Sequence, residues 1–377
     1  MKSDVRLEDR YPEPLLALAS YGLATSSRVL PTRPLSEGVW LAVLESASRN
    51  RLTGLLCAAA ENGCLPTTRE QRHQARELQV SAMAWVMRLE QHLLDVVDLL
   101  TASALDVRVL KGSAVADLDY PDPALRSFID LDILVRSEQI DRAVELLIAA
   151  GFRRRYPQPR PGFDRRFSKG TTFLSPAGYE LDLHRTFVMG PWGLLINLDE
   201  LWNSSEEFDV AGRTLRALSR PVRFMHACYH AALGDWPPRL SSLRDIVQML
   251  LITGQDEPDV RALAARWRAE AVLAAAVSDA WYLLGVGTAI GISQWAESYA
   301  PKKQDEVRMA LYRRGRRTSA AQDVAAISAI SGLRHKAAYL YALVLPDAQY
   351  RAGRHVTAIA RLRHGLVAAV RGRGGRS

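Results

Sequence analysis

Acidic and apolar residues alternate through one short run, FIDLDILV from Phe128 to Val135. Alternate residues of a β-strand point to the same side, so this spacing predicts a strand that projects Asp130 and Asp132 together. Ile129 and the apolar residues at every second position after it would then face the core. Two carboxylates a few ångströms apart repel each other unless a cation lies between them. The run therefore predicts a cation site on a sheet, and oxygen ligands of this kind suit Mg²⁺ or Mn²⁺.

A third acid follows on a second predicted strand. Residues 166–174 and 179–184 favour strands, and the turn Ser-Pro-Ala-Gly at 175–178 joins them into a hairpin. Asp182 lies on the second of these strands, which can pair beside the first acidic strand. An acid within an apolar strand is costly without a partner. Three acids on neighbouring strands therefore indicate a rim of carboxylates around a shared ligand.

A glycine turn precedes the acidic strand. Val107 to Leu110 is a short β-favouring run that ends in Lys111-Gly112-Ser113. Glycine lets backbone N–H groups approach a phosphate closely, and the hydroxyl of Ser113 can donate to it. Such turns are common in proteins that bind no phosphate, so this turn indicates a phosphate site only in combination with the three acids.

The order of the predicted helices and strands along the chain indicates an α+β protein in three parts. Residues 105–200 alternate strand, turn, strand, helix and hairpin, which gives a small mixed sheet with helices. The helix is expected from Ser137 as N-cap, with apolar positions from Ile140 to Ile148 at helical spacing. Residues 1–104 form an N-terminal helical module, with helices at 36–60 and 70–100. Residues 201–377 form a C-terminal helical module with a basic tail, and it would close a cleft over the core.

Together these residues resemble the polymerase-β-like nucleotidyltransferase superfamily, which carries a glycine turn, an acid-x-acid strand and a later strand acid. More closely, the chain is similar to the bacterial family of uncharacterised nucleotidyltransferases. The matching residues are Leu110-Lys111-Gly112, Arg126, Asp130 with Asp132, Asp182-Leu183-His184, Trp236, Leu243-Arg244-Asp245 and Leu345-Pro346. The resemblance covers most of the chain. The gap from Ser113 to Asp130 is longer than is usual in the superfamily.

The resemblance implies nucleotidyl transfer: an acceptor attacks the α-phosphorus of a nucleoside triphosphate, ATP among them, and pyrophosphate leaves. Asp130, Asp132 and Asp182 would be the catalytic residues and the ligands of two Mg²⁺ or Mn²⁺ ions about 4 Å apart. The turn at 111–113 and Arg126 would bind the triphosphate. The acceptor stays open between a small molecule, a peptide and RNA.

Several further residues are open to two interpretations. His184 shares the face of Asp182, so it lies at the rim of the site or packs elsewhere. His226 and His230 have the spacing of a zinc-binding pair, but no third ligand accompanies them. Arg244-Asp245 is expected to form a structural ion pair. The basic loop 153–169 is either a solvated loop or a surface that guides a polyanion.

Composition and charge limit the partners and the cellular compartment that the sequence predicts. Lys and Arg number 49 against 41 Asp and Glu, a formal charge of +8, which favours anionic partners without choosing among them. We find no apolar run of about 18 residues, which predicts no membrane-spanning helix. The N-terminus lacks the apolar stretch of a signal peptide, and the three cysteines form no motif. These features predict a cytoplasmic protein whose cysteines are small buried thiols.

Two alternatives to a metabolite-modifying enzyme remain open at this stage. A toxin-like nucleotidyltransferase would modify RNA ends, and the basic excess favours it. A non-catalytic nucleotide-binding scaffold would bind a triphosphate without releasing pyrophosphate, but it has no reason to hold three acids together.

Overall fold

The computed structural model describes residues 6–23, 25–251, 257–313 and 319–352. Contacts divide the chain into two compact units, and each unit is assembled from three separate stretches. Unit 1 comprises Met1–Asp95, Val109–Ile129 and Ser204–Pro301, and unit 2 comprises Val96–Arg108, Asp130–Asn203 and Lys302–Ser377. The three-part division at residues 104 and 200 stays a prediction. The basic tail lies outside the described residues from position 353 onward.

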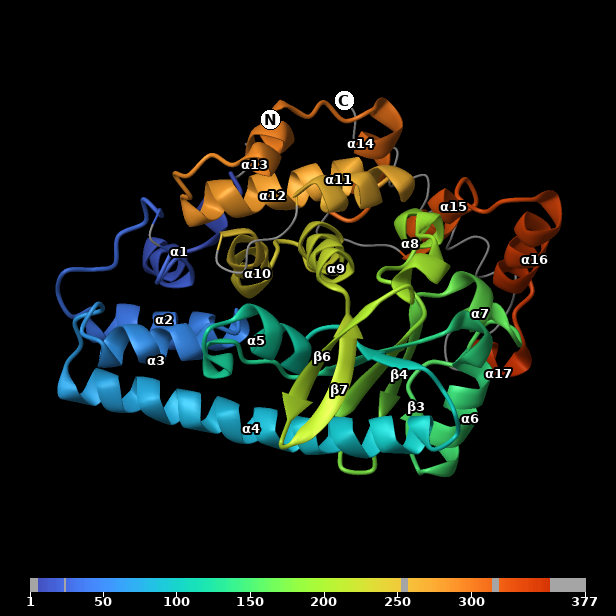
Figure 1. Ribbon diagram of the computed structural model, residues 1–377, viewed down its shortest axis with the longest axis horizontal. Coiled ribbons are helices and arrows are strands. Elements are labelled where there is room, and N and C mark those ends of the chain that lie inside the picture. The colour runs from blue at the N-terminus through green and yellow to red at the C-terminus, as the bar shows by residue number, and fades with distance from the viewer. Residues whose placement is uncertain (1–5, 24, 252–256, 314–318, 353–377) are drawn as a thin grey trace. The chain divides into compact units, whose positions relative to one another are not determined.

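Unit 1 is mainly helical. The helices predicted at 36–60 and 70–100 are confirmed, although the first is two helices that meet near Arg51, which has a positive φ of 58°. The long α4 is prominent in Figure 1. The elements are η1 (Glu8–Arg10), α1 (Glu13–Ala19), α2 (Glu37–Arg49), α3 (Thr53–Glu61), α4 (Arg69–Thr101, its end in unit 2), α5 (Ser113–Asp119), η2 (Pro123–Leu125), α9 (Arg220–Leu233), α10 (Leu240–Leu251), α11 (Glu257–Arg266), α12 (Glu270–Leu284) and α13 (Gly291–Ser298).

Helices α9 to α12 form the core of this unit. Figure 1 shows α9 and α10 nearly end-on, with α11 and α12 running across them. The alanine-rich stretch at 260–284 is divided between α11 and α12. It is interrupted at Arg268, which has a φ of 53°, while the neighbouring Trp267 is fully buried. The amphipathic stretches 221–233 and 240–251 form α9 and α10.

The expectation of an all-helical segment from residue 201 onward is wrong. Strands β6 (Ser205–Val210) and β7 (Arg213–Leu218) form an antiparallel hairpin there. Its two turn residues, Ala211 and Gly212, both have positive φ, at 48° and 77°. Such a turn matches the twist of paired strands. Both strands have several exposed polar residues, so neither carries the apolar run of a buried strand.

Unit 2 holds the strands on which the acids lie. These strands follow the order β3-β4-β5-β2-β1 and include both parallel and antiparallel pairs, which confirms the predicted mixed sheet. Strand β5 pairs in parallel with β2 and antiparallel with β4. The strands are β1 (Val107–Val109), β2 (Leu131–Val135), β3 (Arg153–Arg154), β4 (Gly170–Leu174) and β5 (Glu180–His184).

The helices of unit 2 depart from the sequence prediction in two places. Arg166, expected in a strand, lies in α7, and β4 begins only at Gly170. The helix predicted after Ser137 is confirmed, but Ile148 is 51% exposed instead of buried. The helical elements are η3 (Ser137–Gln139), α6 (Ile140–Ala149), α7 (Phe163–Phe167), α8 (Pro191–Leu195), η4 (Leu198–Leu201), α14 (Lys303–Ala310), α15 (Ser319–Ala326), α16 (Leu333–Val344) and α17 (Ala348–Ala352).

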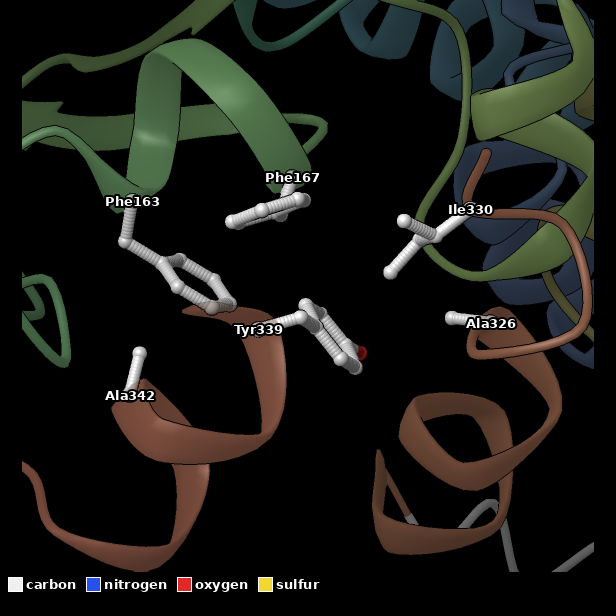
Figure 2. Packing of buried hydrophobic residues seen from close by; sticks show 6 residues of the cluster. All are labelled: Phe163, Phe167, Ala326, Ile330, Tyr339 and Ala342. Atoms are coloured by element: carbon white, nitrogen blue, oxygen red, sulfur yellow. The ribbon is translucent and has the colours of Figure 1, made fainter. Parts of the chain in front are cut away.

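An aromatic cluster joins α7 to the C-terminal helices within unit 2. The ring of Tyr339 stacks on Phe163 with centroids 5.7 Å apart and meets the edge of Phe167 at 5.1 Å. Figure 2 shows these rings with Ala342 of α16, Ala326 of α15 and Ile330. The cluster buries one face of α7, which leads directly into β4. Leu345 and Pro346 lie in the break between α16 and α17.

No helix in the described part of the chain has the length and apolar character needed to cross a bilayer. The cysteines Cys57, Cys64 and Cys228 are free thiols, but the expectation that they are buried holds for Cys228 and is wrong for the exposed Cys64 and the half-buried Cys57.

Candidate active site

The parallel pairing of β2 and β5 brings two of the three predicted acids together. Asp132 is the direct partner of Asp182 across the two strands. Residues opposite each other in a parallel pair project from the same face, so both carboxylates point to one side of the sheet. The apolar residues on either side of Asp132 and Asp182, Leu131 with Ile133 and Leu181 with Leu183, are buried. Apolar packing on one face therefore fixes the position of the acids on the other.

His184 completes the group. Its Nε2 lies 2.8 Å from Asp132 Oδ1 and 3.8 Å from Asp182 Oδ2. Its Nδ1 lies 3.2 Å from the carbonyl oxygen of Thr186. A carbonyl oxygen only accepts, so Nδ1 faces Thr186 with a proton. The carboxylate oxygen of Asp132 also only accepts, so a cation bound to Nε2 would take the place of a proton in that contact. Metal-binding histidines are oriented in this way, because the N–H on one nitrogen leaves the lone pair of the other for the cation.

Asp182 is held in its ionised form. Burial alone raises the pKa of this carboxyl, but the Lys169 ammonium, His184 and the Thr172 hydrogen bond outweigh burial and leave the pKa below its ordinary value. Thr172 Oγ1 donates to Asp182 Oδ1 at 2.5 Å, and Lys169 Nζ lies 3.1 Å from Oδ2. Asp182 is therefore a carboxylate at neutral pH, as a cation ligand must be.

The donor set fits a divalent cation. Asp132, Asp182 and His184 each offer one ligand atom, and these atoms lie within 4.8 Å of one another. The two carboxylates suit Mg²⁺ or Mn²⁺, and the imidazole extends the choice toward transition metals. This trio is the potential metal-binding group found among the described residues.

Asp130 is placed differently from its partners. It precedes β2, which begins at Leu131, and it is not a member of the trio in the described structure. The expectation that Ile129 faces the core is wrong, because its side chain is 55% exposed. Trp85 Nε1 lies 3.4 Å from the Ile129 carbonyl oxygen, two residues before β2 begins.

The predicted triphosphate turn belongs to unit 1. Gly112 has φ 65° and ψ −119°, a conformation that residues with a side chain rarely adopt, and a Cβ there would lie 3.2 Å from the Phe128 ring. Ser113, expected in a turn, is the first residue of the short buried helix α5, which the sequence prediction missed. Leu110, just before the turn, is held by His226, whose Nδ1 lies 3.2 Å from its carbonyl oxygen. His226 therefore positions the turn.

Arg126 is bound within unit 1. Its Nε and Nη2 donate to the two oxygens of Asp245 at 2.8 and 2.7 Å, and Tyr120 also donates to Asp245 at 2.8 Å. The expectation of an ion pair between Arg244 and Asp245 is wrong, because Asp245 pairs with Arg126. Arg244 instead donates to the carbonyl oxygens of Ala19 and Tyr21.

Acids within unit 2 neutralise much of the basic loop 153–169. Arg154 pairs with Asp164, Arg155 pairs with Glu180 at 2.5 Å, and Arg165 pairs with Asp141 at 3.4 Å. Arg160 stacks over Tyr341 at 4.1 Å and donates to the Leu345 carbonyl oxygen at 2.6 Å. These contacts fasten the loop to the unit.

Comparison with known proteins gives the family. A family model described as uncharacterised nucleotidyltransferase matches residues 36–285, about two thirds of the chain. The chain belongs to this family. The predicted family and enzyme class are thereby confirmed, and the matched region contains every candidate site residue named above. No curated protein matches the chain.

Three solved structures show a distant likeness to this nucleotidyltransferase. The solution structure of the antibiotic-resistance factor ANT(2'')-Ia has 15% identity and a TM-score of 0.34, over 48% of this chain and 92% of that one. The crystal structure of ANT(2'')-Ia with adenylyl-2''-tobramycin gives 15% and 0.34, over 48% and 98%. An antigenic nucleotidyltransferase-like protein from Paracoccidioides brasiliensis gives 15% and 0.31, over 55% and 94%.

Two residues of the nucleotidyltransferase site were not singled out from its sequence. Thr172 lies opposite Asp182 in the β4–β5 hairpin, and Lys169 immediately precedes β4. Thr172 lay within the predicted hairpin, but its partner depends on the register of the two strands, which the sequence pattern did not fix. Lys169 was counted only as part of the basic loop.

Proposed function

We propose that this nucleotidyltransferase moves a nucleoside monophosphate from a nucleoside triphosphate to an acceptor hydroxyl or phosphate, with Mg²⁺ or Mn²⁺ as cofactor and pyrophosphate as product. The in-register pairing of Asp132 with Asp182, and His184 beside both, carries this proposal. Two carboxylates and an imidazole converging from one strand pair are costly to hold together unless a cation shares them.

Each acid has a role in the proposal. Asp132 and Asp182 would hold the cation, and Asp130, which lies two residues before Asp132 and just outside β2, is proposed as a further ligand. Divalent cations bound there would lower the pKa of the attacking hydroxyl and neutralise charge on the triphosphate. The lowered pKa of Asp182 suits a ligand better than a general base, since a base works best with a pKa near the working pH.

The turn Lys111-Gly112-Ser113 is proposed to contact the triphosphate. The backbone of Gly112 supports this role, because its positive φ exposes main-chain N–H groups that a side chain would obstruct. Arg126 has two of its donors engaged by Asp245. We propose that Arg126 chiefly supports the segment between this turn and Asp130, and that Lys111 is the better candidate for a phosphate contact.

The basic loop and the trio bear on the two alternatives, an RNA-modifying nucleotidyltransferase and a non-catalytic scaffold. An RNA acceptor gains little support from the basic loop, since Arg154, Arg155 and Arg165 are already paired with acids. A non-catalytic scaffold leaves the trio unexplained. A small-molecule, peptide or RNA acceptor therefore has to be distinguished by experiment, together with the preferred triphosphate.

The test combines pyrophosphate release with product labelling. Each of the four α-labelled triphosphates is incubated with total RNA or with a small-metabolite extract, using the wild type and Asp132→Asn. Loss of a metal ligand should lower pyrophosphate release by at least about 100-fold. Labelled RNA would select the RNA-modifying alternative, and labelled small molecules would select the metabolite acceptor.

Asp141→Asn is the matched control. Asp141 is a half-exposed aspartate of the same unit that pairs with Arg165 at 3.4 Å, away from the trio. It should keep wild-type turnover. If triphosphate binds but no pyrophosphate appears with any acceptor, or if Asp132→Asn is as active as the wild type, the proposed function is wrong.

A further inference from the structure

Lys169 is fixed to the end of β5 by its main chain. Its carbonyl oxygen accepts hydrogen bonds from the backbone N–H groups of Arg185 at 2.7 Å and Thr186 at 3.2 Å. Its own N–H lies 3.1 Å from the sulfur of Met189. Because Thr186 also orients His184, one short segment positions both the imidazole and the lysine backbone. The Lys169 side chain therefore starts from a defined point beside the trio.

The ammonium of Lys169 lies on one particular oxygen of Asp182. Thr172 occupies Oδ1 of this carboxylate, and Lys169 Nζ lies 3.1 Å from Oδ2. Oδ2 also faces His184 Nε2, at 3.8 Å. A cation shared by Asp182 and His184 would use this oxygen. The Lys169 ammonium and a divalent cation would therefore compete for Oδ2 of Asp182.

Lys169 can also leave this position. Its side chain is 33% exposed, whereas that of Asp182 is 19% exposed. Lysine carries its charge on a flexible stem of four carbons and binds phosphate oxygens as a point charge. When cation and nucleotide arrive together, the negative charge of the nucleotide offers the ammonium a second partner near the first.

We propose that Lys169 is a resident counter-ion that makes cation binding depend on the nucleotide. It neutralises Asp182 when the trio holds no divalent cation, and it transfers to a phosphate oxygen of the triphosphate when the cation binds. This proposal deepens the proposed function and rests on it. In this role Lys169 is the positively charged residue that recognises the phosphates of the triphosphate substrate.

The proposal predicts opposite effects of one substitution on two ligands. In Lys169→Met, Mn²⁺ alone should bind about tenfold more tightly, measured by the electron paramagnetic resonance of free Mn²⁺, because a like charge is gone. A non-hydrolysable ATP analogue with a methylene between its α- and β-phosphorus should bind about tenfold more weakly at saturating Mn²⁺, measured by calorimetry, because a phosphate contact is lost. A damaged site would weaken both.

Two variants serve as controls. Lys169→Arg keeps the charge and should stay close to the wild type for both ligands. Lys303→Met removes an exposed lysine of the same unit, which pairs with Glu306 at 2.9 Å, and should change neither. Circular dichroism checks that each variant is folded.

The outcomes separate this inference from the proposed function. If Lys169→Met binds Mn²⁺ no more tightly than the wild type, or binds the analogue equally well, the counter-ion role is overturned. If Asp132→Asn binds Mn²⁺ as the wild type does, the cation site itself is wrong. Loss of Mn²⁺ binding in Asp132→Asn, with opposite shifts in Lys169→Met, supports both.

Discussion

Replacing Asp245 by asparagine tests whether buried charge holds the segment before the acidic strand. The carboxylate accepts two hydrogen bonds from Arg126, at 2.8 and 2.7 Å, and one from Tyr120 at 2.8 Å. The side chains of Arg126 and Asp245 are only 6% and 5% exposed. Asp245→Asn keeps the shape but leaves the guanidinium buried without its counter-charge. Removing one partner of such a pair costs about 3–5 kcal/mol.

Urea-induced unfolding followed by circular dichroism measures this cost. The control is Glu145→Gln, which removes an exposed partner of Arg142 at 3.2 Å and should cost less than about 1 kcal/mol. The double variant Asp245→Leu with Arg126→Met should recover most of the loss, since a buried pair replaced as a whole is often nearly neutral. An Asp245→Asn variant within about 1 kcal/mol of the wild type would refute the reasoning.

Two further predictions concern the acid dependence of stability and the glycine turn. Because the Asp182 pKa lies below its ordinary value, the ionised carboxylate stabilises the fold fully above pH of about 4, and this contribution is lost as the pH falls through the lowered pKa. The urea midpoint of Asp182→Asn should therefore fall less steeply than that of the wild type between pH 6 and 3, and parallel curves would contradict the assignment. Gly112→Ala should cost about 1–3 kcal/mol, because a positive φ of 65° and the Phe128 ring at 3.2 Å both oppose a Cβ. Gly178→Ala meets only the first obstacle, a φ of 87° with no atom within 4 Å, and should cost less in the same unfolding assay; equal costs would show that the ring contact is unimportant.

The sheet was predictable where apolar and acidic residues alternate, and less so elsewhere. Strands β2, β4 and β5 followed from their patterns. Strands β6 and β7 were missed because exposed polar residues dominate them, and because alanine at a positive φ gives no turn signal at Ala211. Gly212 was the other residue of this turn, and its type does favour a turn. The short helix α5 was missed because it is buried on most sides and so shows no amphipathic period.

The candidate site was predictable at the level of strands but not of register. The alternation rule put Asp130 and Asp132 on one side, and the expected pairing of neighbouring strands brought Asp182 beside them. The spacing of two put His184 on the face of Asp182 but left open whether it joined the site. The contact of Thr172 depends on the hairpin beginning its pairing at Leu174 with Glu180. The predicted strand began one residue earlier, at 179, and a shift of one residue changes every partner across the hairpin. The position of Lys169 depends on backbone contacts that no pattern in the sequence displays.

The interleaved chain path of the two units constrains how the protein is made. Unit 1 is completed by a segment that follows residue 203, and unit 2 is completed by a segment that follows residue 301. A growing chain released up to residue 200 therefore supplies fragments of both units and the whole of neither. We expect synthesis to deliver most of the polypeptide before either unit can close. Shorter pieces cut at 104 or 200 would lack packing partners, so ligand studies require the uncut polypeptide.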